Sequence, residues 1–106
     1  MLKLSFYVPK DHLESVKHAL FDVDAGAYQH YQHVCWQVMG TGQFMPIEGS
    51  RPFVGDEGNL ETIEEYRVEM LCDEAIIDKV IKALVTAHPY ESPAYEAWPI
   101  PYCGIT

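Results

Sequence analysis

The residues best suited to chemistry in this sequence gather in one short segment, AHPYESPAY (87–95). It places His88, Tyr90 and Glu91 between Pro89 and Pro93. An imidazole and a carboxylate both bind first-row transition metals, and both exchange protons near neutral pH. The segment therefore predicts either a divalent-metal site or an acid–base pair at His88 and Glu91.

A structural interpretation of the same residues stands beside the chemical one. A histidine that precedes a proline at a helix end can bond the last helical carbonyls, and the prolines stiffen the turn that follows. His88 and Glu91 also supply two potential ligands, whereas a zinc site needs three or four. The sequence leaves both interpretations open.

A second unusual stretch is GTGQFMPIEGSRPFVGDEG, which covers residues 40–58. It holds five of the seven glycines of the chain, together with Pro46 and Pro52. This composition predicts a long ordered loop between about 40 and 59. The GTGQF start lacks the third glycine of a dinucleotide-binding motif, so it indicates a bend or bulge in a strand.

Composition and charge exclude several functional classes. With 106 residues the chain is expected to form one domain, residues 1–106, around a single core. Its net charge of −9 opposes binding to nucleic acid or anionic lipid. The start, MLKLSFYVPK, has too short an apolar run for a signal sequence, and Cys35, Cys72 and Cys103 form no C-x-x-C pair. We therefore expect a cytoplasmic protein with free thiols.

Hydrophobic periodicity predicts four strands and two helices. Residues 2–8 alternate as a half-buried strand, and Asp11 with Glu14 forms a capping-box pattern at the start of a helix. A second helix is predicted to begin at Asp73 and to stop before Pro89. The predicted ranges are strands at 2–8, from 34, about 63–72 and 94–98, and helices at 11–22 and from 73.

This order of elements predicts an α+β fold of the ferredoxin-like, split βαβ type. A four-stranded antiparallel sheet would carry two helices on one face, and we expect the other face to be buried against another copy of the chain. The topology brings residues 9–12, 40–58 and 88–93 to one end of the sheet. We call these three segments the rim, and any site is expected there.

Read together, the motifs resemble a known family. GTGQFMPIEGSRPFVGDEG, EEYRVEMLC and AHPYESPAY resemble the domain inserted in the middle of the Nif-three-like dinuclear-metal-centre proteins. The resemblance runs from about residue 2 to Trp98. It implies a domain similar to CutA and to the PII-type signalling proteins, which assemble as oligomers, commonly trimers. In full-length relatives the metal ions are held by flanking domains, which we expect this chain to lack.

These observations predict a non-enzymatic, homo-oligomeric domain that binds a small ligand or regulates a partner. An alternative is a divalent-metal-binding protein that uses His88 and Glu91 with ligands shared across a subunit interface, and a small hydrolase has the least support. No catalytic residues are predicted, and the ligand is left open. The predicted ligand-binding residues are Gly42, Phe44, Pro46, Phe53, His88, Tyr90 and Glu91.

Overall fold

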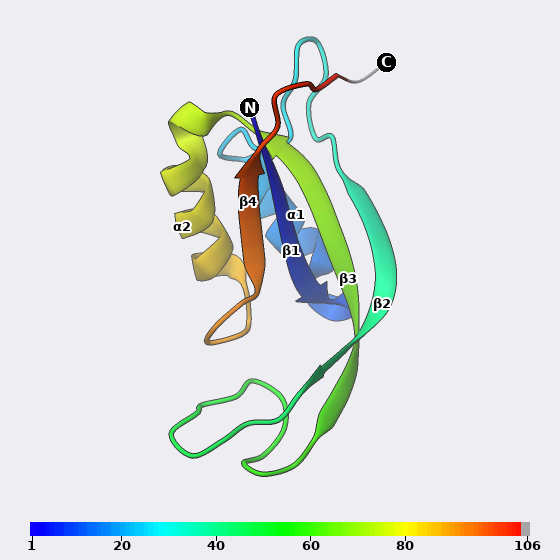
Figure 1. The fold of residues 1–106 in the computed structure, drawn as a ribbon, viewed down its shortest axis with the longest axis vertical. Coiled ribbons are helices and arrows are strands. Elements are labelled where there is room, and N and C mark those ends of the chain that lie inside the picture. The colour runs from blue at the N-terminus through cyan, green and yellow to red at the C-terminus, as the bar shows by residue number, and fades with distance from the viewer. Residues whose placement is uncertain (105–106) are drawn as a thin grey trace.

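The computed structural model describes residues 1–104 and shows the predicted order of elements (Figure 1). The sheet has the strand order β2-β3-β1-β4, and every neighbouring pair is antiparallel. This confirms the ferredoxin-like α+β fold. The elements are β1 (Leu2–Pro9), a 3-10 turn (Lys10–His12), α1 (Leu13–Phe21), β2 (Trp36–Phe44), β3 (Glu61–Cys72), a 3-10 turn (Glu74–Ile76), α2 (Ile77–Ala87) and β4 (Tyr95–Pro99).

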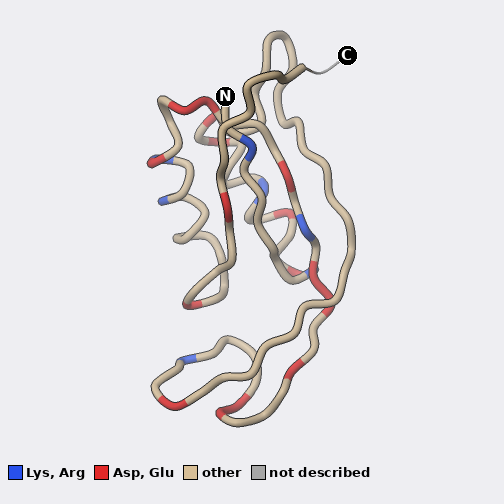
Figure 2. Tube along the Cα trace, in the orientation of Figure 1, with Lys and Arg blue, Asp and Glu red and all other residues tan. Residues whose placement is uncertain are grey.

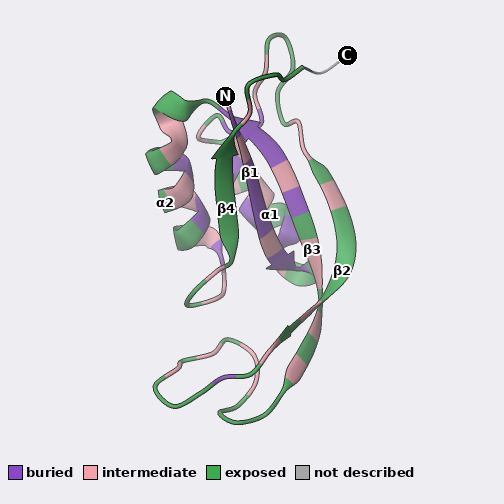
Figure 3. Cartoon of the chain, in the orientation of Figure 1, coloured by how far each residue is buried: buried purple, intermediate pink, exposed green. Residues whose placement is uncertain are grey.

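The core lies between one face of the sheet and both helices. Alternate residues of β1 and β3 point into it, and α1 and α2 supply the opposite wall (Figure 3). Burial of each such aliphatic or aromatic side chain is worth about 1.5–3 kcal/mol. The central, fully buried members are Leu4, Phe6, Val8, Val16, Leu20, Val68, Val80 and Leu84.

The helix ends follow the sequence signals in part. Asp73 caps the turn before α2, because its Oδ1 accepts the Ala75 N–H at 2.9 Å, and α2 ends at Ala87 as predicted. The prediction of a capping box at Asp11 is wrong. Asp11 lies inside the 3-10 turn, and no side chain caps either that turn or α1.

The return from α1 to the sheet depends on Gly26. Its φ is +73°, and a Cβ there would lie 2.8 Å from the Val34 carbonyl oxygen and 2.9 Å from the Phe21 ring. The backbone can approach this closely because glycine has no side chain. Gly26 N–H donates to the Leu71 carbonyl at 2.8 Å, which ties the loop to the end of β3.

The β2–β3 hairpin is longer than the sequence indicated. Gly40 and Gly42 pair with Glu65 and Ile63 inside the ladder, so residues 40–44 belong to β2 rather than to a loop. Glycine is depleted in strands, which is why the loop was predicted to begin at Gly40. The tip of the hairpin extends beyond the body of the sheet, and its loop curls beneath the exit of α2 (Figure 1).

The sheet face opposite the helices is mixed rather than apolar. Arg67 and Glu69 of β3 form an ion pair there at 2.5 Å. Trp36 pairs with Glu69 in register and is 58% exposed, and Trp98, which pairs with Lys3, is 39% exposed. The centre of this face therefore carries charged side chains, and aromatic side chains flank it on the two edge strands.

Acidic positions outnumber basic ones along the trace (Figure 2). Within residues 1–104, none of the helices has both the length and the apolar character required to cross a bilayer.

Candidate ligand-binding site

The three rim segments meet as predicted. The His12 ring contacts Phe53 edge-on, with ring centroids 5.4 Å apart, and Phe53 in turn lies 6.3 Å from the Tyr90 ring. The Arg51 N–H donates to Glu91 Oε1 at 2.8 Å. Residues from the 9–12, 40–58 and 88–93 segments therefore form one cluster.

Beneath the 40–58 loop lies a cavity of about 300 Å³, which we call the rim cavity. Six of the seven predicted ligand-binding residues line it, all except His88. Its walls are mainly apolar, and the polar groups come from two tyrosines, two glutamates, two serines and one glutamine. The lining residues are Tyr7, Gly42, Gln43, Phe44, Pro46, Ser50, Pro52, Phe53, Val54, Ile63, Glu65, Tyr90, Glu91, Ser92 and Ala94.

His88 lies behind the cavity wall and has a structural position. Only 6% of it is exposed, and its Nε2 lies 2.6 Å from the Tyr7 carbonyl oxygen while Nδ1 lies 3.1 Å from the Tyr90 nitrogen. A carbonyl can only accept and a backbone N–H can only donate, so Nε2 carries the proton and Nδ1 accepts. The ring thus joins β1 to the 88–93 segment, instead of bonding the last carbonyls of α2 as the structural interpretation expected.

These bonds also bear on the predicted metal site. Burial lowers the pKa of His88, although its hydrogen bond to Tyr7 opposes this effect. Both ring nitrogens of the neutral ring are occupied, so a metal ion on His88 would have to break one of the two bonds. Within residues 1–104, no group of three or more His, Cys, Asp or Glu side chains is placed to hold a metal ion.

Tyr90 has an apolar contact and an unpartnered polar group. Its ring packs against Phe53, but its buried hydroxyl has no hydrogen-bond partner among the described residues. Burial raises the pKa of Tyr90, and the nearby charge of Glu65 raises it further. Ser50 Oγ and His12 Nδ1 are also buried without a partner there. All three atoms belong to residues of the rim, two of which line the cavity.

Glu65 lines the cavity but is not one of the predicted ligand-binding residues. Its carboxylate lies against the backbone of Gly42, where a Cβ would overlap with Glu65 Oε1. Glycine is therefore required at position 42 if Glu65 is to keep its place. Burial raises the pKa of Glu65.

Sequence reasoning also missed Tyr7, Ser50 and Ile63. The available signal was the strand alternation, which puts Tyr7 and Glu65 on the face away from the core. Tyr7 in particular is the last such residue of β1 before the rim begins.

Comparison with known proteins gives matches to part of much longer chains. No family model matches the sequence. It is 39% identical over 106 residues to a GTP cyclohydrolase 1 type 2 homolog of Halalkalibacterium halodurans, covering all of this chain and 28% of that one. It is 43% identical over 94 residues to the homolog of Mycobacterium leprae, covering 89% of this chain and 24% of the relative.

Solved structures give the same result. A Bacillus cereus protein related to NIF3 matches with a TM-score of 0.82 and 42% identity, over 95% of this chain and 26% of that one. A mutant of CutA1 from Pyrococcus horikoshii matches with a TM-score of 0.70 at 15% identity, over 98% of this chain and 87% of that one, which shows a common fold.

The chain thus spans about a quarter of the length of the curated relatives that it matches. The predicted resemblance is confirmed over nearly all of the sequence. The chain is a relative of one segment of the Nif-three-like proteins, the group that includes the GTP cyclohydrolase 1 type 2 homologs, and it has a CutA-like fold.

Proposed function

We propose that this chain is a homo-oligomeric domain that binds a small molecule in the rim cavity and has no catalytic activity of its own. The observation that carries the proposal is an apolar cavity between the 40–58 and 88–93 segments, in which the Tyr90 hydroxyl is buried without a partner among the described residues. Buried polar groups are normally hydrogen-bonded, so an unpartnered one in a cavity wall suits a ligand that supplies the partner.

The make-up of the cavity supports binding. Ligand pockets are typically concave, mainly apolar and furnished with a few polar groups that fix orientation. Phe44, Pro46 and Phe53 provide the apolar walls, and Tyr90 and Glu65 provide polar atoms. No His or Cys lines the cavity among the described residues, and the Ser50 hydroxyl has no hydrogen-bond partner there, so the wall shows no serine activated by a histidine. The activity in the relatives' name belongs to proteins about four times longer, and we do not assign it to this chain.

Self-association is the second part of the proposal. β2 is an edge strand of nine residues, and its Trp36, Val38 and Met39 side chains are exposed. Long exposed edges and exposed aromatic side chains favour pairing with another chain. We expect three copies, as the resemblance to CutA implies. Light scattering should then give three times the chain mass of 12.1 kDa, and a mass of one chain at micromolar concentration would refute self-association.

Ligand binding can be tested with a cavity-blocking variant and a matched control. Ala94 lines the cavity and is exposed, whereas Ala97, three residues further on, is exposed and lies outside it. A thermal-shift panel of amines, carboxylates, nucleotides and neutral metabolites is expected to contain compounds that stabilise the wild type and Ala97→Phe but not Ala94→Phe. Ligands that stabilise both variants equally would place binding elsewhere, and a panel without any stabilising compound would oppose the proposal.

The divalent-metal alternative can be examined with the same preparation. It would require Glu91 and residues of a second subunit, because both ring nitrogens of His88 are hydrogen-bonded within the chain. Stoichiometric zinc, copper or nickel that survives dialysis would favour this alternative over a small organic ligand.

A further inference from the structure

The rim cavity is negatively charged. Glu65 and Glu91 line it, and no Lys, Arg or His side chain does among the described residues. A phosphate or carboxylate placed there would meet two carboxylates without a compensating positive charge, in a chain whose net charge is −9. The charge of the wall therefore disfavours nucleotides and organic acids, and it favours a cation.

The cavity walls suit an organic cation better than a bare metal ion. Four aromatic side chains, those of Tyr7, Phe44, Phe53 and Tyr90, line the cavity. The negative faces of aromatic rings attract ammonium groups, and this attraction increases when the site excludes water. The same rings give an apolar ligand body a surface on which to pack.

The hydrogen-bonding groups of the cavity also suit an organic cation. One oxygen of Glu91 accepts the Arg51 N–H, and no described residue donates to the other or to Glu65. The Tyr90 hydroxyl is also free, among the described residues, to accept a bond from a ligand N–H. Burial raises the pKa of Glu65, and its carboxylate forms no ion pair with a Lys, Arg or His side chain among the described residues. A protonated amine would supply a positively charged partner.

The volume limits the size of the ligand. About 300 Å³ is at the lower end of the range for small-molecule pockets, so it holds one ring with a short side chain rather than a nucleotide. We propose that the rim cavity binds a compact organic cation, with an aromatic or aliphatic body and one protonated amine that contacts Glu65. This inference rests on the proposed function, because it names the ligand class of the same cavity.

The test uses three probes of nearly equal shape: 2-phenylethylamine, the neutral 2-phenylethanol and the anionic 3-phenylpropanoate. Calorimetric titration of the wild-type protein at pH 7.5 is expected to show binding of the amine, weaker binding of the alcohol and none of the acid. Because all three probes are compared on the wild-type protein, this result does not depend on whether any variant folds.

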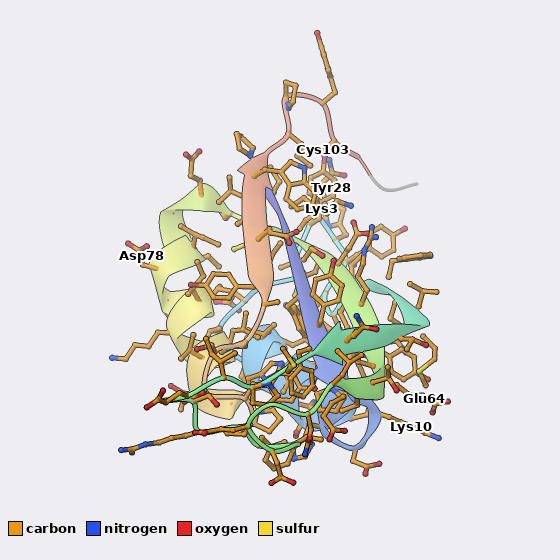
Figure 4. All side chains as sticks on the ribbon, turned by 60° about the horizontal axis from the view of Figure 1, so that its bottom comes forward. Lys3, Lys10, Tyr28, Glu64, Asp78 and Cys103 are labelled. Atoms are coloured by element: carbon orange, nitrogen blue, oxygen red, sulfur yellow. The ribbon has the colours of Figure 1, made fainter. Side chains whose placement is uncertain are left out.

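The role of Glu65 is tested with Glu65→Gln, and Glu64→Gln is the matched control. Glu64 is the preceding residue of β3; it is exposed, lies outside the cavity lining and is labelled at the periphery of the molecule in Figure 4. Glu65→Gln keeps a neutral acceptor but removes the negative charge, so the Kd for the amine should rise about three- to tenfold, with no change in Glu64→Gln.

Three outcomes would overturn the inference. Tighter or equal binding of the alcohol or the acid would exclude a cation site while leaving small-ligand binding in place. Unchanged amine affinity in Glu65→Gln would remove the contact that we assign to Glu65. Absence of binding by all three probes at millimolar concentration would also refute it, and the thermal-shift panel would then decide separately whether the cavity binds ligands of another class.

Discussion

Replacement of Glu91 should release the 40–58 loop without unfolding the sheet. Glu91 precedes β4 and accepts the Arg51 N–H at 2.8 Å, across 40 residues of sequence. This contact ties the 88–93 segment to the backbone of the 40–58 loop. The bond lies outside the core cluster, so its loss should be felt locally.

The size of the effect follows from the chemistry of the bond. Hydrogen bonds to charged groups contribute about 1.5–3 kcal/mol, and the exposure of Glu91 places this one at the lower end, near about 1.5 kcal/mol. Since each 1.4 kcal/mol is a factor of ten, Glu91→Ala should lower the protection of the Arg51 amide about tenfold. Glu91→Gln keeps a neutral acceptor and should lower it about threefold, because a neutral bond has roughly half the strength.

Hydrogen exchange followed by NMR measures this directly. Glu48→Ala is the control, because Glu48 is exposed in the same loop and accepts no hydrogen bond from the described residues. The expected order of Arg51 protection is wild type and Glu48→Ala, then Glu91→Gln, then Glu91→Ala, with β1 and β3 unchanged. Equal protection of the Arg51 amide in all four proteins would refute the proposed role of the Glu91 hydrogen bond in holding the 40–58 loop. Loss of protection throughout the strands would show that Glu91 stabilises the whole domain instead.

Two further measurements address the buried groups. Burial lowers the pKa of His88, so the unfolded chain takes up a proton there at higher pH than the folded chain. The contribution of the neutral ring to the free energy of unfolding is complete above the unfolded pKa of about 6.5. It declines as the pH falls below that value, by at most about 1.4 kcal/mol per pH unit. The free energy of unfolding, measured with denaturant at pH 7.5 and 5.5, should fall at the lower pH in the wild type and fall less in His88→Gln. An equal fall in both proteins would exclude His88 as the titrating group. Cys72 is buried, which raises the pKa of its thiol, and Cys103 is exposed, so native labelling should modify Cys103 and spare Cys72. Labelling of both thiols at one rate would contradict the register of β3.

The fold could be predicted because its signals are periodic. Leu4, Phe6 and Val8 alternate in β1, and every one of them is buried, as are Val80 and Leu84 in the stripe of α2. A period of two or of 3.6 places a whole set of side chains on one face, so errors at single residues do not change the assignment. The rim could be predicted because strand direction alone brings its three segments to one end.

The cavity could be predicted only in part. Phe44, Phe53 and Tyr90 belong to the rim motifs, whereas Tyr7, Ile63 and Glu65 enter the cavity through the pairing of β2 with β3 and of β3 with β1. Pairing register depends on contacts between distant segments, which periodicity within one segment does not contain. The same reason explains why the hairpin was predicted too short: Gly40 and Gly42 resemble loop residues until their partners on β3 are known.

The contact between Gly42 and Glu65 has an evolutionary consequence. A Cβ at position 42 and a full-length glutamate at position 65 cannot keep the observed geometry together, because the two groups would overlap. Glycine at 42 permits the observed placement of the long acid at 65, and any larger residue at 42 requires a shorter or redirected side chain at 65. Related sequences should show these positions changing together, and a chain that has lost the acid should be released from the need for glycine.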